Sequence, residues 1–209
     1  MPALSSILSA PCLYDFYSYC ARGVTYGRTF VADFIRPREG DRVLDIGCGT
    51  GVMLKYLPRV EYVGFDMSPR YIAACRTRYG SRGTFFCERV TRDILRGHQP
   101  FDIVLAVGIL HHLDDAEATD LFALAHSALR PNGRLLTLDG CYAEGQSAAA
   151  RFLLRHDRGT HVRTEPACRA LAQAVFPHVA THILHDMFRV PYTVLIMECA
   201  AQPPAAGRA

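Results

Sequence analysis

The sequence of 209 residues has no long apolar run, no closely paired cysteines and only one lysine, Lys55. Its longest strongly apolar stretch, Ile103 to Leu110, is far too short to cross a bilayer, so we expect no membrane partner. The first eleven residues, MPALSSILSAP, carry no basic residue ahead of their mild apolar patch, which argues against a secretory signal. The net charge of +3 is too small to indicate a nucleic-acid partner. These absences predict a cytoplasmic protein.

The eight cysteines are scattered, without the C-x-x-C pairs that are typical of zinc sites. In a chain of this size, such a distribution is typical of reduced cysteines that pack as small apolar residues. We therefore expect neither a disulfide framework nor a structural metal site. The eight positions are Cys12, Cys20, Cys48, Cys75, Cys87, Cys141, Cys168 and Cys199.

Strand-like and helix-like segments alternate along residues 42–140, which predicts a parallel sheet with helices on both faces. Beyond residue 164, a helix precedes two strands with no helix between them, so one of these strands must be antiparallel. With 50% hydrophobic residues and no internal repeat, we expect one domain over residues 1–200 and a disordered tail at 201–209. The predicted strands are 42–47, 61–66, 84–90, 101–107, 134–140, 178–186 and 192–200. The predicted helices are 13–36, 68–80, 114–133 and 165–176, and a further helix begins at 52.

The stretch DRVLDIGCGTGV places one acid, Asp45, at the end of the first predicted strand, followed by three glycines at alternate positions. Ligands of α/β proteins bind at the carboxyl edge of the sheet, where this motif lies. Glycines there let the backbone turn tightly and approach a ligand closely. The alternative is a strand–turn–helix connection in which the glycines serve geometry alone.

Two further acids favour a ligand site. Asp66 ends the second predicted strand, where a carboxylate can accept hydrogen bonds from both ribose hydroxyls of a nucleoside. Asp93 follows the third strand, near the same edge. The G-x-G-x-G spacing and the three acids disfavour a pyrophosphate, whereas a ligand with positively charged groups tolerates them.

With these motifs in place, the chain resembles the class I S-adenosylmethionine-dependent methyltransferases, especially the small type 11/12-like bacterial members. The matching segments are VLDIGCGTG, GFDMSP, TRDI, FDIVLAVGILHHLDD and LRPNGRLLTLD, in the order of the family's motifs. The resemblance covers about Arg42 to Asp139. It implies a Rossmann-like three-layer α/β sandwich whose seven-stranded, mostly parallel sheet has the order 3-2-1-4-5-7-6, with strand 7 antiparallel.

The resemblance also implies S-adenosylmethionine as the cofactor and S-adenosylhomocysteine as its product. By this likeness, the glycine motif holds the methionine moiety, and the acid after the second strand binds the ribose hydroxyls. The residues after the third strand read the adenine edge, and the end of the fourth strand lines the floor beneath the sulfonium. The residues expected at the methionine moiety are Asp45, Gly47, Cys48, Gly49 and Gly51, and Asp66 is expected at the ribose. Met67 is expected to pack on the face of the adenine, and Asp93 and Ile94 to contact its edge. Val107 and Gly108 are expected to line the floor beneath the sulfonium.

Two adjacent histidines, His111 and His112, follow the fourth strand in GILHHLDD. Methyl transfer from a sulfonium needs alignment and, for a hydroxyl acceptor, a base. The resemblance places His111 nearest the pocket, so it is the first candidate for the general base, with His112 beside it. The alternative is that the pair packs and precedes a helix capped by Asp114. A metal site is not expected, because consecutive histidines rarely chelate one ion.

The family builds its acceptor pocket after the fifth strand and folds an N-terminal lid over the cofactor. Here the pocket segment corresponds to residues 140–165 and the lid to residues 1–38. His156, Asp157, Arg158, His161 and Arg163 are candidates for binding an acidic or hydroxylated acceptor. Tyr14, Tyr17 and Tyr26 are candidates for the wall of the lid. The alternatives are a solvated loop for the first group and core packing for the tyrosines.

The leading hypothesis is a methyltransferase for a small-molecule hydroxyl group, acting as a monomer or homodimer. An RNA or protein methyltransferase is a weaker alternative, because no N/D-P-P-Y/F motif follows the fourth strand. A protein that binds S-adenosylmethionine without methylating also stays open. A nicotinamide-dependent oxidoreductase is disfavoured, because the sequence has neither G-x-G-x-x-G nor a Y-x-x-x-K pattern around its single lysine.

Overall fold

The computed structural model describes residues 25–157 and 159–202. In this part of the chain, seven strands follow one another across a sheet in the order β3-β2-β1-β4-β5-β8-β7, and a short strand, β6, pairs with the end of β5 outside this path. The strands are β1 (Arg42–Ile46), β2 (Glu61–Phe65), β3 (Gly83–Phe86), β4 (Phe101–Val107), β5 (Leu129–Tyr142), β6 (Arg163–Thr164), β7 (His178–Leu184) and β8 (Val194–Ala200).

The pairing confirms the predicted topology. The pairs among strands β1 to β5 are all parallel, whereas β8 is antiparallel to both β5 and β7. Thus β7 and β8 are the sixth and seventh strands of the predicted order, and the last one reverses as expected. All residues of β4 but the last are buried, as expected for a central strand that is covered on both faces.

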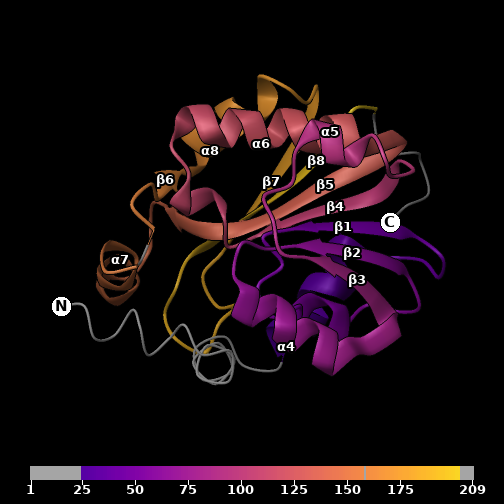
Figure 1. Ribbon diagram of the computed structural model, residues 1–209. Coiled ribbons are helices and arrows are strands. Elements are labelled where there is room, and N and C mark those ends of the chain that lie inside the picture. Colours follow the sequence, from indigo (N-terminus) through magenta and orange to yellow (C-terminus); the bar gives the residue numbers. More distant parts are fainter. Residues whose placement is uncertain (1–24, 158, 203–209) are drawn as a thin grey trace.

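Helices cover both faces of the sheet (Figure 1). Helix α4 lies against one face, together with α3 and the π-helical turn η1; α5, α6 and α8 lie against the other face. Helix α7 lies to one side, beyond the carboxyl end of β5. The bounds are α3 (Thr25–Thr29), η1 (Phe30–Ile35), α4 (Pro69–Tyr79), α5 (Arg92–Leu95), α6 (Asp115–Ala128), α7 (Ala148–Arg155) and α8 (Glu165–Gln173).

The hydrophobic core forms two layers because the strands alternate their side chains between the faces. Leu44 and Ile46 of β1 pack in the cluster that includes α6, whereas Val43 packs in the cluster that includes η1 and α4. Phe30 of η1 is completely buried in the second cluster. Residues 25–35 of the predicted lid therefore contribute to the core, whereas residues 1–24 of that prediction lie outside the described residues.

Several segments differ from the predicted elements: α5, α7 and β6 were not predicted, β3 ends at Phe86, and β5 begins at Leu129. The helix expected from residue 52 is a 3-10 turn, η2 (Val52–Lys55), which follows Gly51 in the left-handed region. Helix α6 ends at Ala128 rather than near residue 133, because Leu129 already pairs with Phe101 of β4 and begins β5. None of the helices in the described ranges is long and apolar enough to span a bilayer.

Helix α6 begins directly after Asp114, the residue that the sequence predicts as its N-cap. The Asp114 carboxylate accepts a hydrogen bond from the backbone N–H of Glu117 at 2.8 Å, and the Glu117 carboxylate accepts one from the Asp114 N–H at 3.2 Å. This capping box satisfies two helix-terminal donors and confirms Asp114 as the predicted cap. It fixes where the turn after β4 becomes a helix.

We expect Asp114→Ala to lower the free energy of unfolding by about 1 kcal/mol, because a backbone donor at the start of α6 loses its acceptor. Urea denaturation at pH 7 measures this change. Asp120→Ala, which removes a carboxylate from an exposed position of the same helix, is the matched control and should change stability by no more than about 0.5 kcal/mol. Equal effects of the two substitutions would contradict a capping role.

Candidate functional site

The glycine loop, residues 47–51, turns back over the end of β2. Gly47 and Cys48 donate their backbone N–H groups to the Phe65 carbonyl at 2.8 and 2.9 Å. Gly47, with φ +71°, lies in the left-handed region, and a Cβ there would lie 2.8 Å from Cδ1 of Ile109. The first glycine of the motif is thus favoured by the left-handed backbone of the turn, and the tip of the Ile109 side chain packs against it.

Asp66, directly after β2, fixes the position of this loop. One of its carboxylate oxygens accepts the Gly49 N–H at 2.9 Å, and the other accepts the Ser68 N–H at 2.8 Å. Ser68 in turn caps α4, as predicted. Backbone N–H groups therefore hold both oxygens of the Asp66 side chain at the edge of the sheet.

Asp45, the acid of the glycine motif, has a different environment. Its side chain is buried, and one carboxyl oxygen accepts a hydrogen bond from the Tyr62 hydroxyl at 2.5 Å. Burial raises the pKa of Asp45 to about 7, partly opposed by the hydrogen bond from Tyr62 and reinforced by the nearby charge of Asp66. This carboxyl group therefore titrates near neutral pH.

Two thiols lie beneath the same loop. Cys75 donates a hydrogen bond to the Gly49 carbonyl at 3.3 Å, and Cys48 lies close to it. The hydrogen bond with Cys75 and burial raise the pKa of Cys48 well above its usual range. A thiol that stays protonated is a poor nucleophile, so Cys48 is a small buried residue in this loop.

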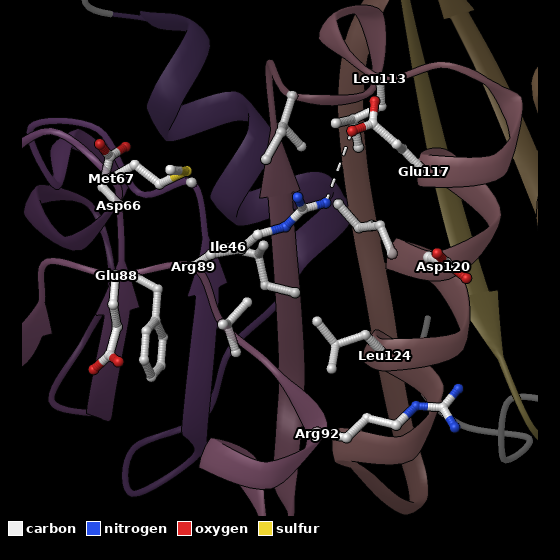
Figure 2. Close-up of a pocket in the computed structure, with 15 residues that line it drawn as sticks. Ile46, Asp66, Met67, Glu88, Arg89, Arg92, Leu113, Glu117, Asp120 and Leu124 are labelled. Atoms are coloured by element: carbon white, nitrogen blue, oxygen red, sulfur yellow. Dashed lines mark ion pairs between the residues drawn. The ribbon is translucent and has the colours of Figure 1, made fainter.

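A cavity of about 690 Å³ opens beside the glycine loop, between the sheet and α5 and α6 (Figure 2). Its volume lies within the range of about 300 to 1,000 Å³ that is common for small-molecule sites. Three of the predicted cofactor residues line it: Gly47, Asp66 and Met67. The other lining residues are Ile46, Phe65, Glu88, Arg89, Val90, Arg92, Ile109, Leu113, Glu117, Asp120, Leu121 and Leu124.

Asp93, predicted to read the adenine edge, is not among the residues that line this cavity. Asp93 lies in the first turn of α5, where its carboxylate is 82% exposed and pairs with Arg96 at 2.9 Å. Ile94 packs against the core beside it. The acid after β3 that lines the cavity is Glu88, two residues beyond the strand, which was not predicted from the sequence. Its position after a strand end, like that of Asp66 after β2, is the signal that identifies it.

Charged side chains also cross the mouth of the cavity. Arg89, after β3, lies 3.9 Å from the Glu117 carboxylate of α6, and Figure 2 shows this ion pair between the two walls. Both side chains are largely exposed, so the pair contributes little to stability. It brings the loop after β3 close to α6.

The loop after β4 carries the two histidines. Val107 ends the strand, and Gly108, with φ +70°, donates its N–H to the Leu138 carbonyl at 2.8 Å. The 3-10 turn η4 (Leu110–His112) follows. Val107 and Gly108 thus lie at the carboxyl edge, next to Ile109 of the cavity wall, although they do not line the cavity themselves.

His111 lies between two carboxylates. Its Nδ1 is 2.7 Å from Oδ1 of Asp139, at the end of β5, and its backbone N–H donates to the same oxygen at 3.3 Å. On the other side of the ring, Nε2 lies 3.7 Å from Oδ1 of Asp157. The His111 ring is mostly buried, whereas the neighbouring His112 is exposed, with its ring centroid 4.1 Å away.

Asp139 and Asp157 are themselves held in place. Asp139 is 5% exposed, and its second oxygen is buried without a hydrogen-bond partner among the described residues. The Tyr192 hydroxyl donates a hydrogen bond to Asp157, and the Gly159 N–H donates another at 3.4 Å. The segment around Gly159 lies directly over His111, because a Cβ at Gly159 would meet the imidazole ring.

Two of the candidate acceptor residues, Arg163 and His161, contact the loop after β4. The Arg163 guanidinium donates to the Leu110 and Leu113 carbonyls at 3.1 and 2.6 Å and pairs with Asp115, so it holds the η4 turn. His161 donates its backbone N–H to the His111 carbonyl at 3.0 Å.

The remaining residues predicted for the acceptor pocket and the lid are exposed, buried in the core, or outside the described residues. His156 is exposed and lies against Phe152. Tyr26 is buried in the core, edge-on to Phe188. Tyr14, Tyr17 and Arg158 lie outside the described residues.

We expect Asp45→Asn to stabilise the ligand-free protein at high pH. The raised pKa means that the folded state binds more protons than the unfolded state between about pH 4 and pH 7, so the wild-type protein loses stability as the pH rises through this window. An amide has no such loss. The stability of Asp45→Asn relative to wild type should therefore increase by about 1–4 kcal/mol between pH 4.5 and pH 8, measured by urea denaturation. A difference that is independent of pH would contradict this.

The comparisons with known proteins agree with this geometry. A family model described as a methyltransferase domain matches residues 44–135, which include the glycine loop, Asp66 and His111. The ubiquinone biosynthesis O-methyltransferase of Mesorhizobium japonicum is 32% identical over 154 residues, which cover 66% of this chain and 61% of that protein. The chain therefore spans less than two thirds of the length of this relative.

Solved structures share the fold over almost the whole chain. The S-adenosylmethionine-dependent methyltransferase SibL in its apo form gives a TM-score of 0.68 at 16% identity, with 97% of this chain and 60% of that chain covered. A TehB-like methyltransferase from Corynebacterium glutamicum gives 0.63 at 16% identity and covers 96% and 100%. Residues 44–135 therefore match the methyltransferase domain family, and the chain shares the fold of S-adenosylmethionine-dependent methyltransferases.

Proposed function

We propose that this protein transfers the methyl group of S-adenosylmethionine to a hydroxyl group of a small molecule, with His111 as the general base. The observation that carries the proposal is the 2.7 Å contact of His111 Nδ1 with the buried carboxylate of Asp139, at the edge where the glycine loop lies. A similar relative, the ubiquinone biosynthesis O-methyltransferase, is named for O-methylation. A small-molecule acceptor is therefore the proposed partner.

The residues around the cavity fit the proposed cofactor. Asp66 offers carboxylate oxygens for the ribose hydroxyls, and Met67 with Leu113 offers apolar contacts for a purine ring. Glu88 supplies an acceptor for its amino group, in place of Asp93. The acids Asp45 and Asp66 match a ligand that carries positive charge. When bound, the cofactor supplies a methyl group on a sulfonium, which is already activated for transfer.

The contact with Asp139 defines the proton chemistry of His111. With Nδ1–H donating to Asp139, the neutral ring keeps Nε2 as its acceptor atom. Nε2 is therefore the atom that takes the proton of the acceptor hydroxyl. The buried carboxylate then stabilises the resulting imidazolium and holds the ring in one orientation.

The acceptor is proposed to approach His111 from the side of Asp157 and Tyr192. Asp157 lies 3.7 Å from Nε2 and accepts a hydrogen bond from Tyr192, so a carboxylate and a phenol surround the reacting nitrogen. Arg163, expected to bind an acidic acceptor, is engaged by backbone carbonyls of the η4 turn. These surroundings favour a neutral hydroxylated acceptor over an acidic one.

We expect Asp66→Asn to weaken the binding of S-adenosylmethionine and S-adenosylhomocysteine by at least about tenfold, because a carboxylate acceptor for the ribose is lost. Isothermal titration measures both affinities, with NAD as a ligand that should not bind. Asp93→Asn is the matched control: its exposed position predicts affinities within about twofold of wild type. Unchanged affinity in Asp66→Asn, or a large loss in Asp93→Asn, would contradict the assignment.

His111→Ala should lower kcat about 100-fold while leaving the affinity for S-adenosylhomocysteine within about twofold, because the base is lost and the cofactor contacts remain. Asp139→Asn should lower kcat in the same direction with little change in KM. Initial rates are measured by release of S-adenosylhomocysteine with the best acceptor from a panel of phenols and other hydroxylated compounds. His156→Ala, an exposed histidine of the same region, is the control. Wild-type rates in His111→Ala would contradict its role as the base.

A further inference from the structure

The cavity beside the glycine loop extends past the residues that are proposed to contact the nucleoside. Its wall on α6 consists of residues at spacings of three, four and seven, which lie on one face of a helix. These residues are Glu117, Asp120, Leu121 and Leu124. Between the first and the last of them the helix makes two turns, about 10 Å. A purine between Met67 and Leu113 reaches only the start of this wall, because Leu113 precedes α6.

The far part of the cavity is apolar on the inside and charged only at the surface. Val90, after β3, and Leu121 are 7% and 6% exposed, and both belong to the core cluster that includes α6. Leu124 is half-buried and packs against the same cluster. We call Val90, Leu121 and Leu124 the apolar subsite. The neighbouring Arg92 and Asp120 are exposed, so they border its mouth.

The apolar subsite lies next to the place that is proposed for the purine amino group. Glu88, the proposed acceptor of that group, is two residues before Val90 on the same wall of the cavity. Figure 2 shows Glu88 and Leu124 on facing sides of the cavity, with Leu124 on α6. A purine amino nitrogen has two N–H bonds. When one of them donates to Glu88, the other is directed away from Glu88, toward the facing wall.

We propose that the apolar subsite binds an uncharged hydrophobic group on the purine amino nitrogen, N6, so that the cavity accepts N6-alkylated adenine nucleosides. This inference rests on the proposed function, because it takes the adenine nucleoside of S-adenosylmethionine as the ligand of the cavity.

The size and chemistry of the cavity support such a group. The volume of about 690 Å³ lies in the upper half of the range for small-molecule sites. The residues expected at the methionine moiety beyond Gly47 do not line the cavity, so its volume is available to the nucleoside and a substituent. An apolar group that leaves water for the apolar subsite stabilises the complex, whereas a charged group there loses hydration without gaining a polar partner.

Isothermal titration of the whole chain with S-adenosylhomocysteine and its N6-benzyl analogue tests the inference. The analogue should bind no more than about threefold more weakly than the parent compound and up to about tenfold more tightly, because its ring leaves water. An isomer with the benzyl group on the ribose 2′ oxygen is the control ligand. It should bind at least about 100-fold more weakly than the parent compound, because that group displaces a hydroxyl from Asp66.

Two substitutions of Leu124 locate the benzyl group. Leu124→Trp fills the apolar subsite, so the N6-benzyl analogue should lose at least about tenfold in affinity while S-adenosylhomocysteine stays within about twofold of wild type. Ser127→Trp, at an exposed position of α6 that does not line the cavity, is the matched control and should leave both affinities within about twofold. Leu124→Ala widens the subsite and should bind the bulkier N6-naphthylmethyl analogue at least about fivefold more tightly than wild type. This second variant tests the inference even where Leu124→Trp does not fold.

The contradicting results are distinct. If wild type binds S-adenosylhomocysteine but binds its N6-benzyl analogue more than about threefold more weakly, the inference is overturned and the proposed function stays intact. Equal loss of both ligands in Leu124→Trp, or unchanged affinity for the benzyl analogue in that variant, also overturns the inference alone. Absence of binding by both S-adenosylmethionine and S-adenosylhomocysteine overturns the proposed function, and the inference falls with it.

Discussion

The site depends on the hydrogen bonds that hold the glycine loop against the end of β2. The loop donates two N–H groups to the Phe65 carbonyl and one, from Gly49, to the Asp66 carboxylate. These contacts need a backbone in the left-handed region at Gly47, where an added side chain would collide with Ile109. One short loop therefore joins the ends of β1 and β2 and places the loop after β4 beside them, which forms the wall of the cavity.

Three carboxyl groups at this edge receive three different partners. Two backbone N–H groups donate to Asp66, an imidazole contacts Asp139, and the Tyr62 hydroxyl donates to Asp45. We propose that Asp66 serves as a fixed acceptor for the ligand and that Asp139 orients His111, whereas Asp45 is a buried carboxyl group with a raised pKa. We therefore propose that the hydrogen-bond partners of each carboxyl group decide its role in the site.

The sequence predicted the sheet order and the cap at Asp114, because both depend on local patterns and on motifs in a fixed order. It did not separate Asp93 from Glu88, since both follow β3 and only the turn into α5 decides which acid faces the cavity. Arg163 and Tyr192 depend on contacts between distant segments: Arg163 holds the η4 turn, and Tyr192 reaches Asp157. Local patterns carry no information about such contacts.

The most direct test of the proposed site is a crystal structure of the protein with S-adenosylhomocysteine. We expect the ribose hydroxyls to lie within hydrogen-bond distance of the Asp66 carboxylate and the amino group of the ligand to lie against Asp45. The thioether sulfur should lie on the side of the glycine loop that faces His111. A ligand bound elsewhere on the molecule, or bound in the cavity without contact to Asp66, would contradict the proposed site.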